Sequence, residues 1–249
     1  MTDLSTIKLR LFVEADLGPG REIALAAGQA HYLGTVMRRK AGDGMLLFNG
    51  KDGEWLAEIR EISRKACTVS IREQTRPQSG EPDLWLLFAP IKRARLDYTI
   101  EKATELGAKV VRPMFTEFTD VERVNLERLK ANAVEAAEQC RRLTVPEILP
   151  PARSLEEALE GLPAGWRRFV FDTGEGAAPA SEVLAGVPRD GVPAALVIGP
   201  EGGFSPRERA FLIEAPNVYR MTLGPRILRA DTAAVAAFTL WQALQGDWR

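Results

Sequence analysis

The sequence predicts an α/β protein with two domains, and three features of the chain support this prediction. From residue 9 to about residue 75, short strand-like runs alternate with Gly, Asp, Asn and Lys turns such as Asn49-Gly50. Residues 73–82 are polar and contain two prolines and a glycine, the composition of a linker. After the linker, strand-like and helix-like runs alternate, which favours a parallel sheet covered by helices. We therefore expect one domain over residues 1–75 and a second over residues 76–249.

The first domain is predicted to be a small β-barrel or sandwich interrupted by one helix. Strands are expected at residues 10–13, 44–48, 55–59 and 67–71, and the helix at residues 30–39. The helix prediction rests on an apolar stripe that begins at Tyr32 and ends at Met37. Arg38 and Arg39 close this helix, where cations complement the helix dipole. His31, the only histidine, fits a structural or surface role better than a catalytic one.

The second domain is predicted to alternate between strand and helix along its length. Strands are expected at residues 84–90, 110–115, 145–149, 168–172, 194–198 and 218–223, and helices at residues 96–106, 125–143, 154–161 and 233–244. Gly107 fits the C-cap of the first of these helices. A further helix is expected after Ser205, because Pro206 fits the first helical position and Glu208 completes a Ser-x-x-Glu capping box.

Two strand ends in the second domain have the composition of a ligand-binding site. The run 194–198 ends in Gly199-Pro200-Glu201-Gly202-Gly203, and the run 218–223 ends in Gly224-Pro225-Arg226-Ile227-Leu228-Arg229. Ligands usually bind at the carboxyl ends of strands in open α/β sheets, and glycines let a ligand approach the backbone. Together the two loops suit a ligand with an apolar ring, polar edges and a charge. The alternative is that both are ordinary turns between a strand and a helix.

Several other site classes lack their signatures in this chain. Neither loop continues into the Gly-Lys-Ser/Thr of a phosphate-binding loop, and neither matches a G-x-G-x-x-G dinucleotide fingerprint. No acidic metal cluster is evident, which argues against a nucleotide phosphohydrolase. The only residues of their types, Cys67, Cys140 and His31, cannot form a four-ligand zinc site within one chain, so we expect no metal.

Composition gives weaker information about partners and compartment. The formal net charge is −1, so any contact with nucleic acid must come from local basic patches. No apolar run approaches the roughly 20 residues needed to span a bilayer, and the N-terminus lacks a signal-peptide pattern. We therefore expect a cytoplasmic protein with reduced thiols and no membrane association.

The two strand-end motifs resemble those of a known enzyme family. Residues 198–205, Ile-Gly-Pro-Glu-Gly-Gly-Phe-Ser, and residues 223–233, Leu-Gly-Pro-Arg-Ile-Leu-Arg-Ala-Asp-Thr-Ala, are similar to motifs of the SPOUT methyltransferases, most closely the RsmE family. The resemblance implies methylation of N3 of a uridine in 16S rRNA of the small ribosomal subunit, with S-adenosylmethionine as cofactor. It also implies a PUA-like RNA-binding β-barrel followed by a SPOUT α/β domain with a C-terminal trefoil knot.

The segment 229–233 departs from the family pattern at Ala230 and Asp231, and the change at Asp231 bears on the chemistry. Where the family carries Arg-Thr-Glu-Thr-Ala, this chain has Asp231 in place of the glutamate, which shortens the acid by one methylene. Uridine N3 is protonated until it reacts, so the reaction needs a proton acceptor and a cation that stabilises the developing charge. We expect Arg229 or Arg226 to contact the uracil oxygens and Asp231 or Glu201 to accept the proton. For Asp231, a plain N-cap of the last helix is the alternative.

The resemblance also assigns binding residues by motif position. Cofactor contacts are expected at three strand ends: Phe171, Thr173, Ile198, Gly199, Glu201, Gly202, Leu223, Gly224, Ile227 and Leu228. RNA contacts are expected from three basic clusters: Arg38 and Arg39; Lys92, Arg93 and Arg95; and Arg141 and Arg142. Each cluster has a structural alternative as solvated cations. Lys92, Arg93 and Arg95 lie near a helix N-terminus, where the dipole disfavours cations by about 0.3–1 kcal/mol each, which favours an anionic partner.

The last helix predicts an interface between subunits. It is apolar on nearly every face, so a second surface must cover what the domain's own sheet leaves exposed. This agrees with the homodimer that the family resemblance implies. Two other functions stay open: another SPOUT reaction, such as ribose 2′-O-methylation of tRNA, and a non-catalytic RNA-binding or ribosome-assembly protein.

Overall fold

The computed structural model describes residue 7, residues 9–174 and residues 176–248. By their internal contacts the residues divide into two units. The first unit consists of Met1–Gly80 with Ala137–Val145, and the second of Glu81–Ala136 with Pro146–Arg249. The short segment 137–145 thus belongs to the first unit, although along the chain it lies between the two segments of the second unit.

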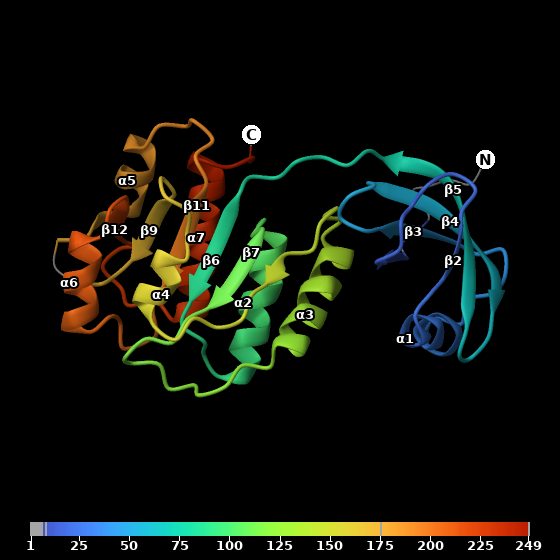
Figure 1. The fold of residues 1–249 in the computed structure, drawn as a ribbon, viewed down its shortest axis with the longest axis horizontal. Coiled ribbons are helices and arrows are strands. Elements are labelled where there is room, and N and C mark those ends of the chain that lie inside the picture. The colour runs from blue at the N-terminus through green and yellow to red at the C-terminus, as the bar shows by residue number, and fades with distance from the viewer. Residues whose placement is uncertain (1–6, 8, 175, 249) are drawn as a thin grey trace. The chain divides into compact units, whose positions relative to one another are not determined.

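A five-stranded sheet forms the first unit, with strand order β1-β3-β4-β5-β2 (Figure 1). Its strands are β1 (Arg10–Phe12), β2 (Glu22–Ala24), β3 (Gly44–Phe48), β4 (Glu54–Ile62) and β5 (Cys67–Arg76). β1 pairs with β3 in parallel, and the other pairs are antiparallel. Alternate residues such as Met45, Leu47 and Val69 are fully buried in one apolar core, as a sheet with one covered face requires. The strands expected from the sequence are confirmed, while β2 was not expected.

The helix expected at residues 30–39 is displaced and divided. An α-helical turn, α1 (Ala27–His31), is followed by a π-helical turn, η2 (Tyr32–Val36). The side chain of Gln29 accepts a hydrogen bond from the Ala26 amide at 3.2 Å, which fixes the earlier start. The prediction was wrong at both ends because it took the apolar stripe for a buried face; Leu33 is buried, but Tyr32 and Val36 are exposed.

A buried cation organises the edge of the first unit. The Arg10 guanidinium donates to Glu54 at 2.6 Å and lies 3.7 Å from the centre of the Phe48 ring. It also donates to the carbonyls of Ala137, at 2.7 Å, and of Arg142. Burial lowers the pKa of Arg10, and the bond to Glu54 opposes that shift. These contacts hold the last turn of α3 (Leu126–Gln139) and the backbone just after it. The helix ends at Gln139, whereas it was expected to continue to residue 143.

Seven parallel strands form the sheet of the second unit, in the order β10-β12-β9-β11-β6-β7-β8 (Figure 1). Their bounds are β6 (Leu84–Phe88), β7 (Val110–Pro113), β8 (Glu147–Ile148), β9 (Arg167–Phe171), β10 (Ala178–Pro179), β11 (Ala194–Ile198) and β12 (Val218–Thr222). All six neighbouring pairs are parallel, as the alternation of strand and helix predicted. β12, β9 and β11 are adjacent, so their carboxyl ends lie together at one edge of the sheet.

Helices pack on this sheet in two groups. Their bounds, besides α3, are α2 (Arg93–Glu105), α4 (Leu155–Glu160), α5 (Ala180–Gly186), α6 (Pro206–Glu214) and α7 (Ala230–Leu244). α4 and α6 contact each other and share an apolar cluster with the strand residues Val170 and Val197. α7 contacts β11, α2 and α5. The neighbours of Val170 and Val197 along their strands, Phe169 and Ile198, alternate onto the other face, toward α7.

Most helix starts and stops in the second unit follow the sequence signals. α6 begins at Pro206 with the capping box of Ser205 and Glu208, as predicted. Gly107 has φ 90° just after α2, a conformation that favours glycine, and a Cβ there would lie 2.6 Å from the side-chain amide nitrogen of Gln242. α2 itself begins at Arg93, earlier than expected, and places Lys92 at its N-cap.

Candidate functional site

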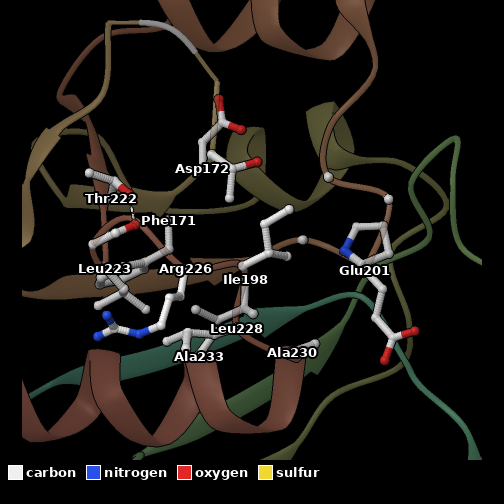
Figure 2. Close-up of a pocket in the computed structure, with 17 residues that line it drawn as sticks. Phe171, Asp172, Ile198, Glu201, Thr222, Leu223, Arg226, Leu228, Ala230 and Ala233 are labelled. Carbon is white, nitrogen blue, oxygen red and sulfur yellow. Dashed lines mark hydrogen bonds between the residues drawn. The ribbon is translucent and has the colours of Figure 1, made fainter.

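A cavity of about 200 Å³ opens at the carboxyl ends of β9, β11 and β12, against the first turn of α7 (Figure 2). Its lining is Phe171, Asp172, Thr173, Ile198, Gly199, Pro200, Glu201, Gly202, Gly203, Thr222, Leu223, Gly224, Arg226, Ile227, Leu228, Ala230 and Ala233. Every residue that the sequence assigned to cofactor contact lines this cavity. Figure 2 shows apolar side chains between the strands and α7, with Arg226 and Glu201 on opposite sides in this view. We call it the strand-end cavity.

The loop after β11 forms one wall and is shaped by glycine and an aromatic ring. A Cβ on Gly199 would lie 3.0 Å from the buried ring of Phe204, so a larger residue there would have to displace that ring. Gly203 has φ 71° and its amide donates to the Pro200 carbonyl at 2.9 Å, which closes the turn. The wall therefore presents backbone groups, and few side chains, to the cavity.

The loop after β12 forms the facing wall. The Thr222 hydroxyl donates to the Gly224 carbonyl at 3.3 Å, and Gly224 adopts φ 109°. Leu223 and Leu228 are half-buried against the cavity, whereas the Ile227 side chain is 81% exposed. This loop supplies apolar surface on one side and the Arg226 cation at the rim.

Asp172 fixes the third wall, at the end of β9. Its carboxylate is buried and accepts hydrogen bonds from Arg220 at 2.8 Å and from Arg209 at 3.2 Å. The Gly174 amide donates to the same carboxylate at 3.1 Å. Burial alone would raise the pKa of Asp172, but the bonds from Arg220, Arg209 and Gly174 outweigh it and hold the pKa below its usual value.

The two acids that were expected to accept a proton share one cation. Arg95, in the first turn of α2, donates to the Glu201 carboxylate at 3.0 Å and lies 4.0 Å from the Asp231 carboxylate. The Glu201 side chain is 61% exposed and the Asp231 side chain 16%. Asp231 is not the N-cap of α7, because Arg229 occupies that position and Asp231 lies in the first turn. The plain-cap interpretation of Asp231 is therefore wrong.

The two arginines that were expected to contact the substrate differ in position. Arg226 lines the strand-end cavity. Arg229 is exposed and is absent from the described lining of that cavity. Both are carried by the loop between β12 and α7, so Arg226 is the better placed of the two for a ligand inside the cavity.

Basic residues of the first unit are placed unequally for RNA. Arg38 and Arg141 are exposed, and both adopt positive φ, 52° and 61°. Arg39 is half-buried, 4.0 Å from Asp43. Arg142 is buried and its carbonyl accepts the bond from Arg10, so its side chain offers little surface to a partner.

In the second unit, Lys92 is exposed at the N-cap of α2. Arg95 is partly exposed and engaged by Glu201. The side chain of Arg93 lies outside the described part of the structure. His31, in the first unit, is exposed and its Nδ1 lies 3.3 Å from the Thr35 hydroxyl, in keeping with a surface role.

Sequence reasoning missed part of the strand-end cavity and its support. Asp172 directly follows the apolar run of β9, and this position was the one available signal for it. Arg209 and Arg220 have no local signature, because they lie 37 and 48 residues from Asp172 along the chain. Within the described residues, no three His, Cys, Asp or Glu side chains gather where they could hold a metal ion. No helix in the same part of the chain is both long and apolar enough to cross a membrane.

Comparison with known proteins identifies the family to which this chain belongs. Residues 79–242 match a family model described as an RNA methyltransferase domain, and residues 25–72 match an RNA methyltransferase PUA domain. The ribosomal RNA small subunit methyltransferase E of Rickettsia conorii is 34% identical over 232 residues, which cover 92% of each chain. The chain belongs to this methyltransferase E family.

Two further members of the methyltransferase E family agree over nearly their whole length. The protein of that name from Buchnera aphidicola subsp. Schizaphis graminum is 28% identical over 249 residues, 96% of this chain and 97% of its own. The crystal structure of methyltransferase E from Neisseria gonorrhoeae, bound to S-adenosyl methionine, has a TM-score of 0.87 at 27% identity and covers 97% of this chain and 99% of that one. The PUA-like first domain and the α/β methyltransferase domain expected from the motifs are thus confirmed.

Proposed function

We propose that this chain transfers a methyl group from S-adenosylmethionine to N3 of a uridine in 16S rRNA of the small ribosomal subunit. The observation that carries the proposal is the strand-end cavity, whose walls are the two motifs that resemble the RsmE family. The names of the relatives, which are methyltransferases of small-subunit ribosomal RNA, support the substrate class.

The residues of the strand-end cavity fit this cofactor. Ile198, Leu223 and Leu228 offer apolar surface for the adenine ring, and the glycine-bearing backbone after β11 offers amides and carbonyls to its polar edge. Asp172 and Glu201 are paired with arginines, and their carboxylate oxygens in the lining are hydrogen-bond acceptors that suit the amino groups of the cofactor. S-adenosylmethionine supplies an electrophilic methyl group when bound. The protein's part is to hold that group in line with the attacking nitrogen and to accept the N3 proton.

Glu201 and Asp231 are the candidate proton acceptors, and Arg226 and Arg229 the candidate cations for the uracil oxygens. Glu201→Gln and Asp231→Asn each remove a charge at nearly constant shape. We expect at least one of them to lower the methylation rate by about 100-fold or more, with cofactor affinity and thermal stability unchanged, because the proton then has no acceptor. Full activity in both variants would contradict acid participation, and Arg226→Ala and Arg229→Ala test the arginines in the same assay.

The remaining parts of the proposal concern assembly and location. The first domain, residues 1–75, binds RNA, and residues 76–249 form the methyltransferase domain with a C-terminal trefoil knot. Along α7, Val235, Leu240 and Leu244 are only half-buried, which supports a homodimer that covers them. The enzyme acts in the cytoplasm, because that is where its substrate, ribosomal RNA, is found.

Transfer of a label tests the function directly. Purified protein and S-adenosylmethionine with a labelled methyl group are incubated with small ribosomal subunits, or with bare 16S rRNA, that lack the mark. Mass spectrometry of the digested RNA is expected to find the label on N3 of one uridine. Label on a ribose 2′-oxygen or on tRNA would contradict uridine N3 as the acceptor and indicate another methylation reaction. If calorimetry detects no binding of S-adenosylmethionine, a non-catalytic RNA-binding protein is favoured instead.

A further inference from the structure

A second cavity, of about 240 Å³, lies beside the strand-end cavity within the second unit. Its walls come from the start of α2, from the loop between β7 and α3, and from the loop after β11. Pro200, Glu201 and Gly202 line both cavities. One loop therefore separates the two, and a group bound in the second cavity lies within one loop's thickness of a group bound in the first.

The second cavity carries an exposed aromatic ring on an anchored loop. Phe118 is 43% exposed and lines the second cavity, so its side chain is accessible to a ligand there. Its loop is closed by hydrogen bonds between Thr116 and Thr119, at 2.9 and 2.8 Å. The Glu117 amide donates to the buried Glu208 carboxylate at 3.0 Å. The ring is thus held by its backbone on both sides.

Gly202 lets the Phe118 side chain pack close to the loop after β11. A Cβ on Gly202 would lie 3.2 Å from the Phe118 Cβ, so the side chain packs directly on bare backbone. Gly202 has no positive φ, so this close approach, and not backbone conformation, is what a side chain there would disturb. The aromatic face and the loop shared with the strand-end cavity form one continuous wall.

The polar side chains that line the second cavity include both donors and acceptors, as recognition of a uracil edge requires. Lys92 and Arg95 are donors, and Glu201 is an acceptor held by Arg95 at 3.0 Å. The Watson–Crick edge of uracil presents an N3–H donor between two carbonyl acceptors. Enzymes that modify a flipped-out base read this edge by hydrogen bonds and stack the ring on an aromatic side chain.

We propose that the second cavity receives the acceptor nucleobase of the RNA, flipped out and stacked on Phe118, with its edge toward Lys92, Arg95 and Glu201. This assignment rests on the proposed function. Glu201 then becomes the proton acceptor, because it lines both cavities. The N3–H proton passes to its carboxylate and the N3 electron pair forms the bond to the methyl carbon. The carbon–sulfur bond breaks with its electron pair on sulfur, leaving S-adenosylhomocysteine.

Three variants separate stacking from packing. Phe118→Leu removes the aromatic face at similar size, Phe118→Trp keeps an aromatic face, and Tyr98→Leu is the matched control. Tyr98 is also 43% exposed and belongs to the same unit, but it lines neither cavity. Methyl transfer to small subunits lacking the mark is measured, together with S-adenosylmethionine affinity and thermal unfolding.

Phe118→Leu is expected to lower kcat/KM for the RNA by about 10-fold or more, the size of a lost base–aromatic stack. Phe118→Trp is expected to recover most of that loss, and Tyr98→Leu to match the unaltered protein. Cofactor affinity is expected to stay the same in all three. Equal activity of Phe118→Leu and Tyr98→Leu would overturn the proposal, and so would a loss in Phe118→Leu that follows lost cofactor affinity.

A second measurement does not depend on turnover. The protein is mixed with small-subunit RNA and S-adenosylhomocysteine and irradiated with ultraviolet light, and cross-linked peptides are mapped. We expect a cross-link from an RNA base to the segment that contains Phe118. Cross-links elsewhere in the chain but none in this segment would overturn the base-binding assignment. A cross-link at Phe118 in a protein that transfers no methyl group would leave base binding standing and remove the proposed reaction.

Discussion

Among the single residues that line the strand-end cavity, Asp172 is the one whose buried carboxylate is bonded to two arginines. Its carboxylate is buried at the end of β9 and is bonded to Arg220, Arg209 and the Gly174 amide. Arg209 also lies near Gly203, where a Cβ would be 3.2 Å from its Nη2. One ion-paired cluster therefore joins the loops after β9 and β11 and keeps the cavity in shape.

Removing the Asp172 charge is expected to destabilise the second unit. Asp172→Asn removes the buried charge that pairs with Arg209 and Arg220, at a cost of about 3 kcal/mol in the free energy of unfolding. Asp190→Asn is the matched control, because the Asp190 side chain is 44% exposed where it pairs with Arg167 at 2.7 Å, so the loss should stay below about 1 kcal/mol. Chemical denaturation measures both, and equal losses would contradict the special role of Asp172.

The same carboxylate predicts a dependence of stability on pH. The folded-state pKa of Asp172 lies below the unfolded value of about 3.9, so the folded state holds the carboxylate charged at pH values where the unfolded state takes up a proton. Its stabilisation is therefore complete well above pH 4 and is lost as the pH falls through the folded pKa. The stability difference between the unaltered protein and Asp172→Asn should shrink between about pH 5 and pH 2. A difference that stays constant over this range would contradict this prediction.

At this scale the sequence predicted residues with local signals and missed those with distant partners. Gly199 and Gly202 line the strand-end cavity, in keeping with the close backbone approach that a glycine in a strand-end loop implies, and their contact with the cofactor stays a prediction. Arg95 was interpreted as an RNA contact, and its pairing with Glu201, 106 residues away, could not be read from its neighbours. Arg95 can both pair with Glu201 and contact RNA when the ion pair faces the acceptor base.

At the scale of elements, the start of α6 links two loops that flank the site. The capping box of Ser205 and Glu208 was predicted from the Ser-x-x-Glu spacing and is present, with the Ser205 amide donating to Glu208 at 2.8 Å. The second oxygen of Glu208 accepts from the Glu117 amide, 91 residues away. A helix cap thereby also holds the loop of Phe118.

Glu208→Ala removes both bonds, so the amides of Ser205 and Glu117 lose this acceptor. We expect a loss of about 2 kcal/mol in the free energy of unfolding, together with slower methyl transfer as the Phe118 loop loosens. Glu214→Ala, at the exposed end of the same helix, is the control and should change stability by less than about 0.5 kcal/mol. Slowed transfer in the control, or normal transfer in Glu208→Ala, would contradict the link between cap and loop.

Helix boundaries were the weakest part of the prediction from sequence, for a physical reason. α3 ends at Gln139 where Arg10, 127 residues from Ala137, takes up the backbone carbonyls. The first helix begins early because Gln29 completes a cap that the apolar stripe did not reveal. α5 and β10 were not expected at all, since the short run 178–186 carries little periodic signal.

At the scale of the whole molecule, the order of strands and helices was predictable and the grouping of segments was not. The alternation after residue 82 gave the parallel sheet, and the polar linker suggested a boundary at residues 75 and 76, which stays a prediction. The chain returns to the first unit at Ala137–Val145, which no change in composition marks. The net charge of −1 gave no indication of an RNA substrate, which entered through the motifs alone.

Cofactor binding at the strand-end cavity tests the central claim most directly. Titration calorimetry of S-adenosylmethionine is performed on the unaltered protein, on Leu228→Asp, which puts a charge into the apolar wall, and on Ile213→Asp, whose exposed position on α6 lies outside the described lining of the cavity. The account predicts saturable binding by the unaltered protein and by Ile213→Asp, and at least about a 10-fold loss of affinity in a folded Leu228→Asp. No binding by the unaltered protein, or undiminished binding by Leu228→Asp, would contradict it.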